Sequence, residues 1–203
     1  GGQGTGKTTT SSLIKIILSK YFKLNVFRIS IDDFYKTRKE RFLLSKKIHP
    51  LLMTRGVPGT HDVSLMLDFF KRSKRKKFRS LKLPRFNKAI DDRYNKKLWH
   101  SLKKRPDIII FEGWCVGAKA EKHNVLKKSV NSLEKLKDKK LIWRRYVNRQ
   151  LQSKYKQLYD QLNCLLYIKS KNFSLLRKWR IKQERKLSLK NKKFNDHKIM
   201  SDK

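Results

Sequence analysis

The sequence predicts an α/β fold, a three-layer arrangement in which a mostly parallel β-sheet carries helices on both faces. Three observations support this prediction. A glycine-rich stretch leads directly into a helical pattern, two short apolar runs are typical of buried parallel strands, and each run ends at an acidic residue. A chain of 203 residues can bury one sizeable core, so we expect residues 1–203 to form a single domain.

The glycine-rich stretch carries a phosphate-binding motif. Gly1–Thr8 has the sequence G-G-Q-G-T-G-K-T and matches the phosphate-loop pattern G-x-x-x-x-G-K-[ST]. In such a loop backbone N–H groups surround a phosphate, the lysine reaches the β- and γ-phosphates, and the last hydroxyl can ligate Mg²⁺. The residues expected to bind the nucleotide are Gly1, Gly2, Gln3, Gly4, Thr5, Gly6, Lys7, Thr8 and Thr9.

A helix is expected directly after the loop, because apolar residues recur at helical spacing within Thr9–Lys20. The alternative is a flexible Gly- and Thr-rich terminus ahead of an ordinary helix. A phosphate loop joins a buried strand to a helix, so we also expect a strand upstream of Gly1. The prediction is therefore a P-loop NTPase fold whose first strand, and whose C-terminal end, lie outside this sequence.

The charge of the chain is strongly basic, with 54 Lys and Arg against 16 Asp and Glu and a net charge of +38. A nucleic-acid partner would explain this charge, since a basic field attracts phosphate backbones. We favour a composition bias spread over solvated faces, because basic residues occur in every predicted element, and we expect no nucleic-acid partner. Only Lys71–Arg79 is a true basic run, which could dock an anion or RNA.

The two cysteines, Cys115 and Cys164, form no C-x-x-C pair. We therefore expect neither a disulfide framework nor a zinc site, and a reducing cytoplasm as the compartment. No apolar run approaches the length of about 18 residues that a membrane span needs, so no membrane partner is expected. A targeting segment upstream of the sequence is compatible with this reading.

The first predicted strand, Asn25–Ile31, ends at the carboxylate pair Asp32 and Asp33. Ligands of open α/β sheets bind beyond the carboxyl ends of the strands, so this pair points to the site. One carboxylate could accept a substrate hydroxyl proton while the other holds a metal or caps the next turn. We expect Asp33 and the nearby Tyr35 to contact the substrate, with a simple N-cap as the alternative for Asp33.

The second strand, Pro106–Phe111, is continuous, branched and apolar, as expected for a parallel strand covered on both faces. It ends at Glu112. An acidic residue beside a phosphate loop holds Mg²⁺ in NTPases, directly or through water. Thr8 and Glu112 are therefore the predicted metal ligands.

Two polar loops are candidates for contact with the acceptor substrate. The Gly/Pro turn Thr54–Asp62 brings together Arg55, His61 and Asp62 ahead of an apolar helix that Thr60 or Asp62 could cap. A purely structural role is the alternative for His61.

The second loop follows a short predicted strand at Leu81–Pro84 and contains Arg85, Lys88 and Arg93. These cations could grip a carboxylate or a phosphate, and a solvated charged loop is the alternative.

Four further elements complete the prediction. Lys36–Leu52 is expected to be helical in part, Trp143–Asp160 is an amphipathic helix, and Leu162–Ile168 is a strand. The cationic helix Phe173–Leu187 could act as a lid over transferring phosphates. Its alternative is a basic face exposed to solvent.

In order, these motifs resemble those of the plant-type D-glycerate 3-kinases and their bacterial relatives, within the uridine kinase, phosphoribulokinase and pantothenate kinase group. The matching stretches cover nearly the whole chain: G-G-Q-G-T-G-K-T, S-I-D-D-F-Y, H-P-L-L-M-T-R-G-V-P-G-T-H-D, L-P-R-F-N-K-A-I-D-D-R, I-I-I-F-E-G-W, V-N-S-L-E, W-R-R-Y-V-N and R-K-W-R-I-K-Q-E. The pair R-G-V-P-G-T-H-D and F-E-G-W is far more specific than the phosphate loop. Departures are Asn87, where Asp is common, and Ser129, where Pro is common.

The resemblance implies roles for individual residues in a kinase that uses ATP and Mg²⁺. Asp32 would be the base or orienting group for the accepting hydroxyl, and Glu112 would assist Mg²⁺. Arg180 and Arg177 would be lid arginines, and with Lys7 and Asp32 they form the predicted catalytic set.

The resemblance also places His61 and Asp62 where related kinases contact the acceptor, and it implies a small hydroxy acid, D-glycerate, as that acceptor. The product would be 3-phosphoglycerate. Two alternatives stay open: a kinase of the same fold for a nucleoside or a pantothenate-like acid, and a basic, nucleotide-regulated RNA-binding protein.

Overall fold

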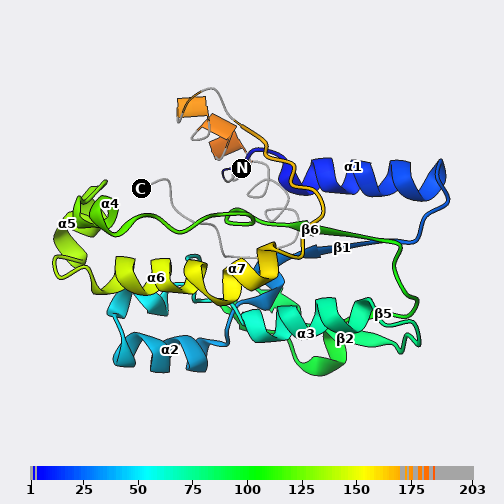
Figure 1. The fold of residues 1–203 in the computed structure, drawn as a ribbon, viewed down its shortest axis with the longest axis horizontal. Coiled ribbons are helices and arrows are strands. Elements are labelled where there is room, and N and C mark those ends of the chain that lie inside the picture. The colour runs from blue at the N-terminus through cyan, green and yellow to red at the C-terminus, as the bar shows by residue number, and fades with distance from the viewer. Residues whose placement is uncertain are drawn as a thin grey trace.

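The computed structural model describes Gly2, residues 4–169 and positions 172, 174, 175, 178, 179, 181, 182 and 185. Within this part of the chain two parallel strands lie between helices, as the sequence predicts (Figure 1). Strands β1 (Val26–Ser30) and β6 (Ile108–Glu112) pair in parallel, with Val26 opposite Ile108 and Ser30 opposite Glu112. The two predicted strands therefore form the centre of the fold, although every residue of β6 is half-buried rather than buried as predicted.

Helices cover both faces of this strand pair. Helix α1 (Lys7–Lys20) contacts β1 and β6 on one face (Figure 1). Helix α3 (Val63–Ser73) covers the other face through aromatic contacts, with ring centroids 6.2 Å apart for Phe69 and Phe27. Burying one such apolar side chain contributes about 1.5–3 kcal/mol, so the three layers are held together mainly by this core.

The remaining described elements surround these layers. Their bounds are α2 (Arg38–Lys47), β2 (Leu81–Leu83), β3 (Phe86–Asn87), β4 (Asp92–Arg93), β5 (His100–Leu102), α4 (His123–Lys127), α5 (Ser132–Lys137), α6 (Ile142–Gln152) and α7 (Lys154–Tyr159), with 3₁₀ turns at Ile31–Phe34, Pro50–Met53 and Lys96–Leu98. Strands β2 and β5 form one antiparallel pair, and β3 and β4 form another. The predicted strand at Leu81–Pro84 and the partial helix within Lys36–Leu52 are confirmed.

The predicted single helix at Trp143–Asp160 is wrong, because the chain forms two helices that break at Ser153. The backbone of Ser153 has φ −110° and ψ −106°, far from helical values. Its hydroxyl donates to the carbonyl of Arg149, at 2.9 Å, which competes with the backbone for that acceptor. Periodicity of apolar residues continues across the break, so the sequence pattern alone does not reveal it.

The predicted strand at Leu162–Ile168 is also wrong. This segment has no regular secondary structure and pairs with no described strand. Together with α1 and β6 it lines a cavity of about 680 Å³. An apolar, branched run adopts the strand state only when another backbone offers hydrogen bonds, and along this cavity no described segment does so.

Three further predictions concern a membrane span, the cysteines and the lid helix. Among the described residues no helix is long and apolar enough to cross a membrane. Cys115 is buried and Cys164 is exposed, and both are free thiols. The predicted lid helix, Phe173–Leu187, falls largely outside the described residues.

Candidate functional site

The strand register brings the two key carboxylates to one edge of the sheet. Ser30 lies opposite Glu112 at the carboxyl ends of β1 and β6, and Asp32 follows Ser30 by two residues in a 3₁₀ turn. The Ser30 hydroxyl oxygen accepts from the backbone N–H of Asp32 and caps that turn. The edge therefore carries both predicted acidic residues next to the phosphate loop, as sequence reasoning required.

The end of β6 depends on Gly113. A Cβ at this position would lie 2.3 Å from Cγ2 of Ile31 in the turn that carries Asp32. Only glycine allows the two strand ends to come this close without moving the turn. The position explains physically why glycine follows Glu112 in the sequence.

The phosphate loop enters helix α1 with the geometry that an anion site needs. Gly4 and Gly6 have φ values of 79° and 80°, in the left-handed region that glycine adopts without strain. Helix α1 begins directly afterwards, at Lys7, so its first N–H groups and its positive dipole end lie at the loop. The loop residues Gly1 and Gln3 lie outside the described residues.

Lys7 bonds to its own loop in this structure. Its Nζ donates to the carbonyl oxygen of Gly2 at 2.5 Å, and the Thr5 hydroxyl donates to the same carbonyl at 2.8 Å. Burial lowers the pKa of Lys7, and the nearby carboxylates of Glu112 and Asp32 oppose that shift. The ammonium group thus lies among the groups that a γ-phosphate and its metal would contact.

Thr8 and Glu112 converge on one point. The Thr8 hydroxyl donates to Oε1 of Glu112 at 3.4 Å, and Nη1 of Arg28 on β1 lies 3.9 Å from the same oxygen. No group of three or more His, Cys, Asp or Glu residues is arranged to hold a metal within the described part of the chain. The two side chains predicted as metal ligands are therefore in contact with each other at this point.

The carboxylate of Asp32 has a cationic neighbour. Nζ of Lys88, on the loop between β3 and β4, lies 2.7 Å from Oδ2 of Asp32. The Lys88 side chain is 60% exposed and the Asp32 side chain 28% exposed, so the pair faces solvent and its contribution to stability is small. Two predicted site residues are therefore in direct contact, although they lie far apart in the sequence.

Asp33 has a structural contact instead. Its Oδ1 accepts from the backbone N–H of Phe86 at 3.3 Å and so ties the Asp32 turn to the β3–β4 hairpin. Burial raises the pKa of Asp33 above its ordinary value, and the hydrogen bond from Phe86 opposes that shift. Asp33 therefore positions the hairpin that carries Lys88.

Tyr35 and His61 form the buried wall beside this turn. Their rings stack with centroids 4.3 Å apart, and the two residues form an antiparallel bridge. Nδ1 of His61 lies 2.7 Å from the hydroxyl oxygen of Tyr155. Burial lowers the pKa of His61 to about 3, so its ring is neutral at physiological pH.

Asp62 and Arg93 hold the loops together. Asp62 caps α3, since its Oδ1 accepts from the backbone N–H of Leu65 at 3.1 Å, and its Oδ2 lies 3.2 Å from Nη2 of Arg93. Nε of Arg93 donates to the carbonyl of Tyr35 at 2.7 Å. Both residues lie beside the predicted acceptor site, but their polar groups are already bonded within the protein.

Arg55 is paired with a residue that the sequence analysis did not single out. Asp91 bonds to Arg55 and also to Arg41, whose Nη2 lies 2.8 Å from Oδ2 of Asp91. Burial raises the pKa of Asp91, but the hydrogen bonds from the two arginines outweigh it and hold the pKa below its ordinary value. Both guanidinium groups also lie 5.7 Å from the ring centroid of Phe86. The available sequence signal for these ion pairs was Asp91 itself, an acidic residue in a loop whose predicted site residues are all basic.

Of the other predicted site residues, Arg85 and Thr9 are described by the structure and the two lid arginines are not. Arg85 lies over the ring of Tyr94, at 4.9 Å, and its guanidinium is held against this aromatic face. Thr9 lies in the first turn of α1 and is exposed. The lid arginines Arg177 and Arg180 lie outside the described residues.

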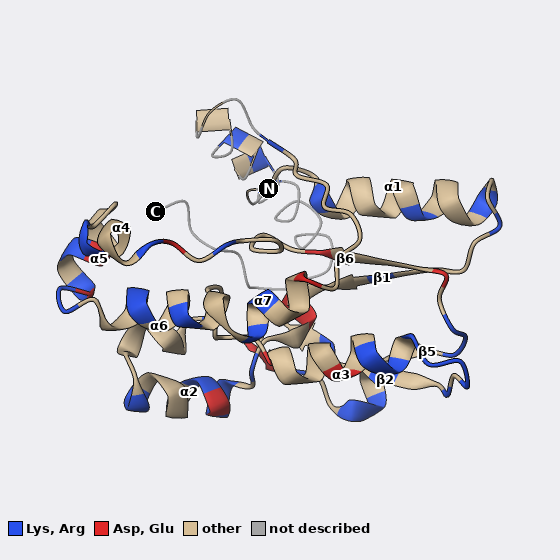
Figure 2. Ribbon diagram, in the orientation of Figure 1, with Lys and Arg blue, Asp and Glu red and all other residues tan. Residues whose placement is uncertain are grey.

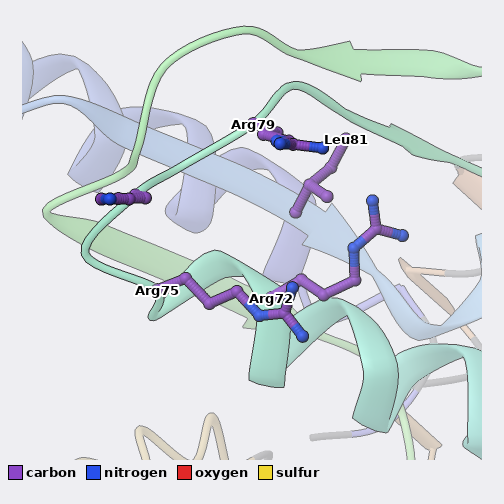
Figure 3. Close-up of a pocket in the computed structure, with 5 residues that line it drawn as sticks. Arg72, Arg75, Arg79 and Leu81 are labelled. Carbon is purple, nitrogen blue, oxygen red and sulfur yellow. The ribbon is translucent and has the colours of Figure 1, made fainter.

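The basic run does not form part of this site. Arg72 and Arg75 at the end of α3, with Lys77, Arg79 and Leu81, line a separate cavity of about 420 Å³ (Figure 3). Elsewhere Lys and Arg are spread over helices and loops alike (Figure 2). Basic residues are therefore not confined to the Lys71–Arg79 run in the described part of the chain.

Comparison with known proteins identifies several similar kinases, although no family model matches. An uncharacterized kinase of Schizosaccharomyces pombe, mug58, is 29% identical over 210 residues, spanning 100% of this chain and 72% of that protein. The chloroplastic D-glycerate 3-kinase of Arabidopsis thaliana is 30% identical over 190 residues, 90% of this chain and 39% of that enzyme.

Solved structures agree with these similarities. The D-glycerate 3-kinase of Cryptococcus neoformans superposes with a TM-score of 0.81 at 26% identity, covering 97% of this chain and 69% of that chain. The YGR205w protein superposes with a TM-score of 0.73 at 28% identity, covering 100% of this chain and 70% of that chain. These relatives support an ATP-dependent kinase that acts on an alcohol group. The chain is therefore a homologue of P-loop kinases, among them the D-glycerate 3-kinases.

Proposed function

We propose that this protein transfers the γ-phosphoryl group of ATP to a hydroxyl group of D-glycerate and forms 3-phosphoglycerate. The observation that carries the proposal is the convergence of Lys7, Thr8, Asp32 and Glu112 at one edge of the sheet. A phosphate loop alone is compatible with hydrolysis or regulation. The carboxylate of Asp32, which contacts Lys88 at the solvent-facing edge of the sheet, adds a group that can take a hydroxyl proton, which is the requirement of a kinase.

In this proposal Asp32 accepts the proton of the attacking hydroxyl as the phosphoryl group moves. Lys7 leaves the carbonyl of Gly2 and contacts the β- and γ-phosphates. Its electrostatic attraction to them is stronger than in water because the site is partly buried. Arg177 and Arg180, the residues that match the family's lid arginines, would spread the remaining charge. Positioning and electrostatics supply most of the rate in such reactions.

The donor set fits Mg²⁺, which we propose as the metal. Mg²⁺ prefers oxygen ligands and is usually held by one or two protein groups together with phosphate oxygens and water. Thr8 Oγ1 and Glu112 Oε1, 3.4 Å apart, supply two such oxygens beside the phosphate loop. When bound, the metal would neutralise charge on the phosphates, while the protein groups keep it at the loop.

The acceptor carboxylate would pair with cations of the surrounding loops. Lys88 is the best placed, because its ammonium already contacts a carboxylate, Asp32, and is mostly exposed. Arg55 and Arg85 are further candidates, each partly exposed and held over an aromatic ring. Arg93 is better described as the group that positions the backbone of Tyr35.

The test is an ATP-consumption screen over small hydroxy acids, nucleosides and pantothenate, with the protein and with a Lys7→Ala variant. We expect ATP-dependent turnover with D-glycerate that the variant loses. Preferred turnover of a nucleoside or of pantothenate would instead identify a kinase of the same fold for another acceptor. Salt-dependent RNA binding without turnover of any acceptor would favour the RNA-binding alternative.

For the compartment we propose the cytoplasm. The support is the pair of free cysteines, since a buried and an exposed thiol persist without oxidation in a reducing environment. Cell fractionation of the source organism tests this point. We expect the protein in the cytoplasmic fraction, and its recovery in an organelle fraction would contradict the proposal.

A further inference from the structure

Tyr155 and His61 form a buried pair whose chemistry the catalytic scheme above does not use. Tyr155 is 0% exposed and His61 2% exposed. Nε2 of His61 is buried and has no hydrogen-bond partner among the described residues. Leaving a buried polar atom unpaired costs about 1–3 kcal/mol, so this atom requires an explanation.

The hydrogen bonds of Tyr155 determine which nitrogen of His61 carries the proton. The Tyr155 hydroxyl oxygen accepts from the backbone N–H of Gly59 at 2.9 Å. Burial raises the pKa of Tyr155 well above its usual range, so the hydroxyl keeps its one hydrogen. Of the hydrogen-bond partners of this hydroxyl among the described residues, the Gly59 N–H can only donate, so the hydroxyl hydrogen is directed at Nδ1 of His61, 2.7 Å away.

This arrangement leaves His61 as a neutral donor. A neutral imidazole has one N–H and one acceptor nitrogen, so an accepting Nδ1 places the proton on Nε2. The ring is also clamped, by stacking on Tyr35 at 4.3 Å and by the edge of Tyr155 at 6.0 Å between centroids. The unpaired Nε2 atom is therefore an N–H group of fixed direction.

We propose that Tyr155 is a positioning residue that holds His61 in the Nε2–H tautomer, so that His61 donates a hydrogen bond to an oxygen of the acceptor substrate. The proposal rests on the proposed kinase function, and it specifies how the acceptor is recognised. A neutral N–H donor binds a hydroxyl or carboxylate oxygen, and because Nδ1 already accepts from Tyr155, the ring has no free nitrogen that could take the proton of the substrate in place of Asp32.

The position of His61 supports a role at the acceptor. His61 forms its bridge with Tyr35, the residue that ends the Ile31–Phe34 turn carrying Asp32. The charged groups that act on its ring are Asp32, which opposes the lowering of its pKa, and Lys36, which adds to it. Water does not reach Nε2 in this structure, so an acceptor that bonds this atom must displace a neighbouring side chain as it enters.

The first test is the tautomer itself, which needs neither ATP nor an acceptor. Long-range ¹H–¹⁵N NMR of histidine-labelled protein distinguishes a protonated from an unprotonated ring nitrogen, and a His61→Gln variant assigns the signal among the five histidines. We expect the proton on Nε2 across pH 5–8. We expect Tyr155→Phe to lose this single-tautomer pattern. A proton on Nδ1 in the unmodified protein, or an unchanged pattern in Tyr155→Phe, would overturn the proposal.

The second test is recognition of the acceptor, with D-glycerate as the probe. Tyr155→Phe and His61→Leu should raise KM for D-glycerate by about tenfold, equivalent to about 1.4 kcal/mol, with KM for ATP unchanged. His61→Gln should retain part of the affinity, since its amide is also a neutral donor. The matched control is Tyr159→Phe, which removes a partly buried hydroxyl of the same helix that donates to the carbonyl of Cys115 instead.

The two proposals fail separately. Absence of turnover with D-glycerate in the unmodified protein contradicts the proposed function, while the NMR tautomer still decides the role of Tyr155. If Tyr155→Phe does not fold, the His61→Leu and His61→Gln pair decides. An equal KM for both, matching the unmodified enzyme, would contradict donation by His61.

Discussion

At the scale of residues, Asp32 is the group that we propose as the base. It lies at the end of β1, and its carboxylate contacts Lys88 at 2.7 Å and acts electrostatically on Lys7. Asp33, its neighbour, is committed to the backbone of Phe86. Two adjacent and chemically identical side chains thus differ in their contacts: Asp33 is bonded to the backbone, whereas Asp32, the proposed base, contacts a solvent-exposed lysine.

Replacement of these two residues tests that division. Asp32→Asn should lower kcat about 10²–10⁴-fold, the usual contribution of a general base, with little change in KM for ATP. Asp33→Asn is the matched control and should keep most of the activity, because the amide oxygen of Asn can still accept from Phe86. Steady-state kinetics with saturating ATP measures both. Near-normal turnover of Asp32→Asn would show that the base is elsewhere.

His61 gives a prediction about stability and pH. Burial lowers its pKa to about 3 in the folded protein, whereas an unfolded histidine titrates near pH ~6.5. Between these values the unfolded state binds more protons, so the free energy of unfolding falls as the pH falls, by up to about 1.4 kcal/mol per pH unit.

The variant His61→Gln removes this titration. Its loss of stability between pH 7 and about pH 5 should be smaller than that of the unmodified protein by up to roughly 2 kcal/mol. Urea unfolding at the two pH values measures the difference. Parallel losses in the two proteins would mean that His61 is not a buried neutral group.

At the scale of elements, apolar runs with β-branched residues predicted β1 and β6 correctly because both strands find parallel partners in each other. The same kind of pattern failed at Leu162–Ile168, where no described strand offers a partner. It also failed at Ser153, where the backbone leaves helical values although the apolar periodicity continues across the break. A local sequence pattern does not show which strand will pair with a segment, or where a helix will break, because both depend on the rest of the fold.

The site shows the same limit. The positions of Asp32, Glu112 and Thr8 follow from strand ends and a motif, which local sequence carries. The pairing of Arg55 with Asp91, and of His61 with Tyr155, depends on how loops fold back on helices. Tyr155 could be predicted only as a member of the apolar face of a helix.

Asp62 offers a prediction at this scale because it begins helix α3. Asp62→Ala removes the cap of α3 and the partner of Arg93, and should lower the free energy of unfolding by about 0.5–2 kcal/mol. Asp62→Asn keeps a good cap and should lose much less. Urea unfolding of the two variants decides the structural role. Equal stability combined with a raised KM for D-glycerate would show that Asp62 acts on the substrate instead.

At the scale of the whole molecule, the net charge of +38 sets the response to salt. Like charges spread over one small surface repel each other, and this repulsion is screened over about 10 Å at 0.1 M salt. We therefore expect the Tm to rise as KCl is increased from about 20 mM to about 500 mM. A Tm that falls over this range would mean that attractive ion pairs, such as Asp91 with Arg41, outweigh the repulsion.

The central claim, phosphoryl transfer to D-glycerate at the edge formed by β1 and β6, has a direct test. ³¹P NMR of the protein with Mg²⁺, ATP and D-glycerate follows both the γ-phosphate and the product. The account predicts a growing signal of 3-phosphoglycerate, lost in Lys7→Ala and strongly reduced in Asp32→Asn. Release of inorganic phosphate alone, at the same rate with and without D-glycerate, would contradict it.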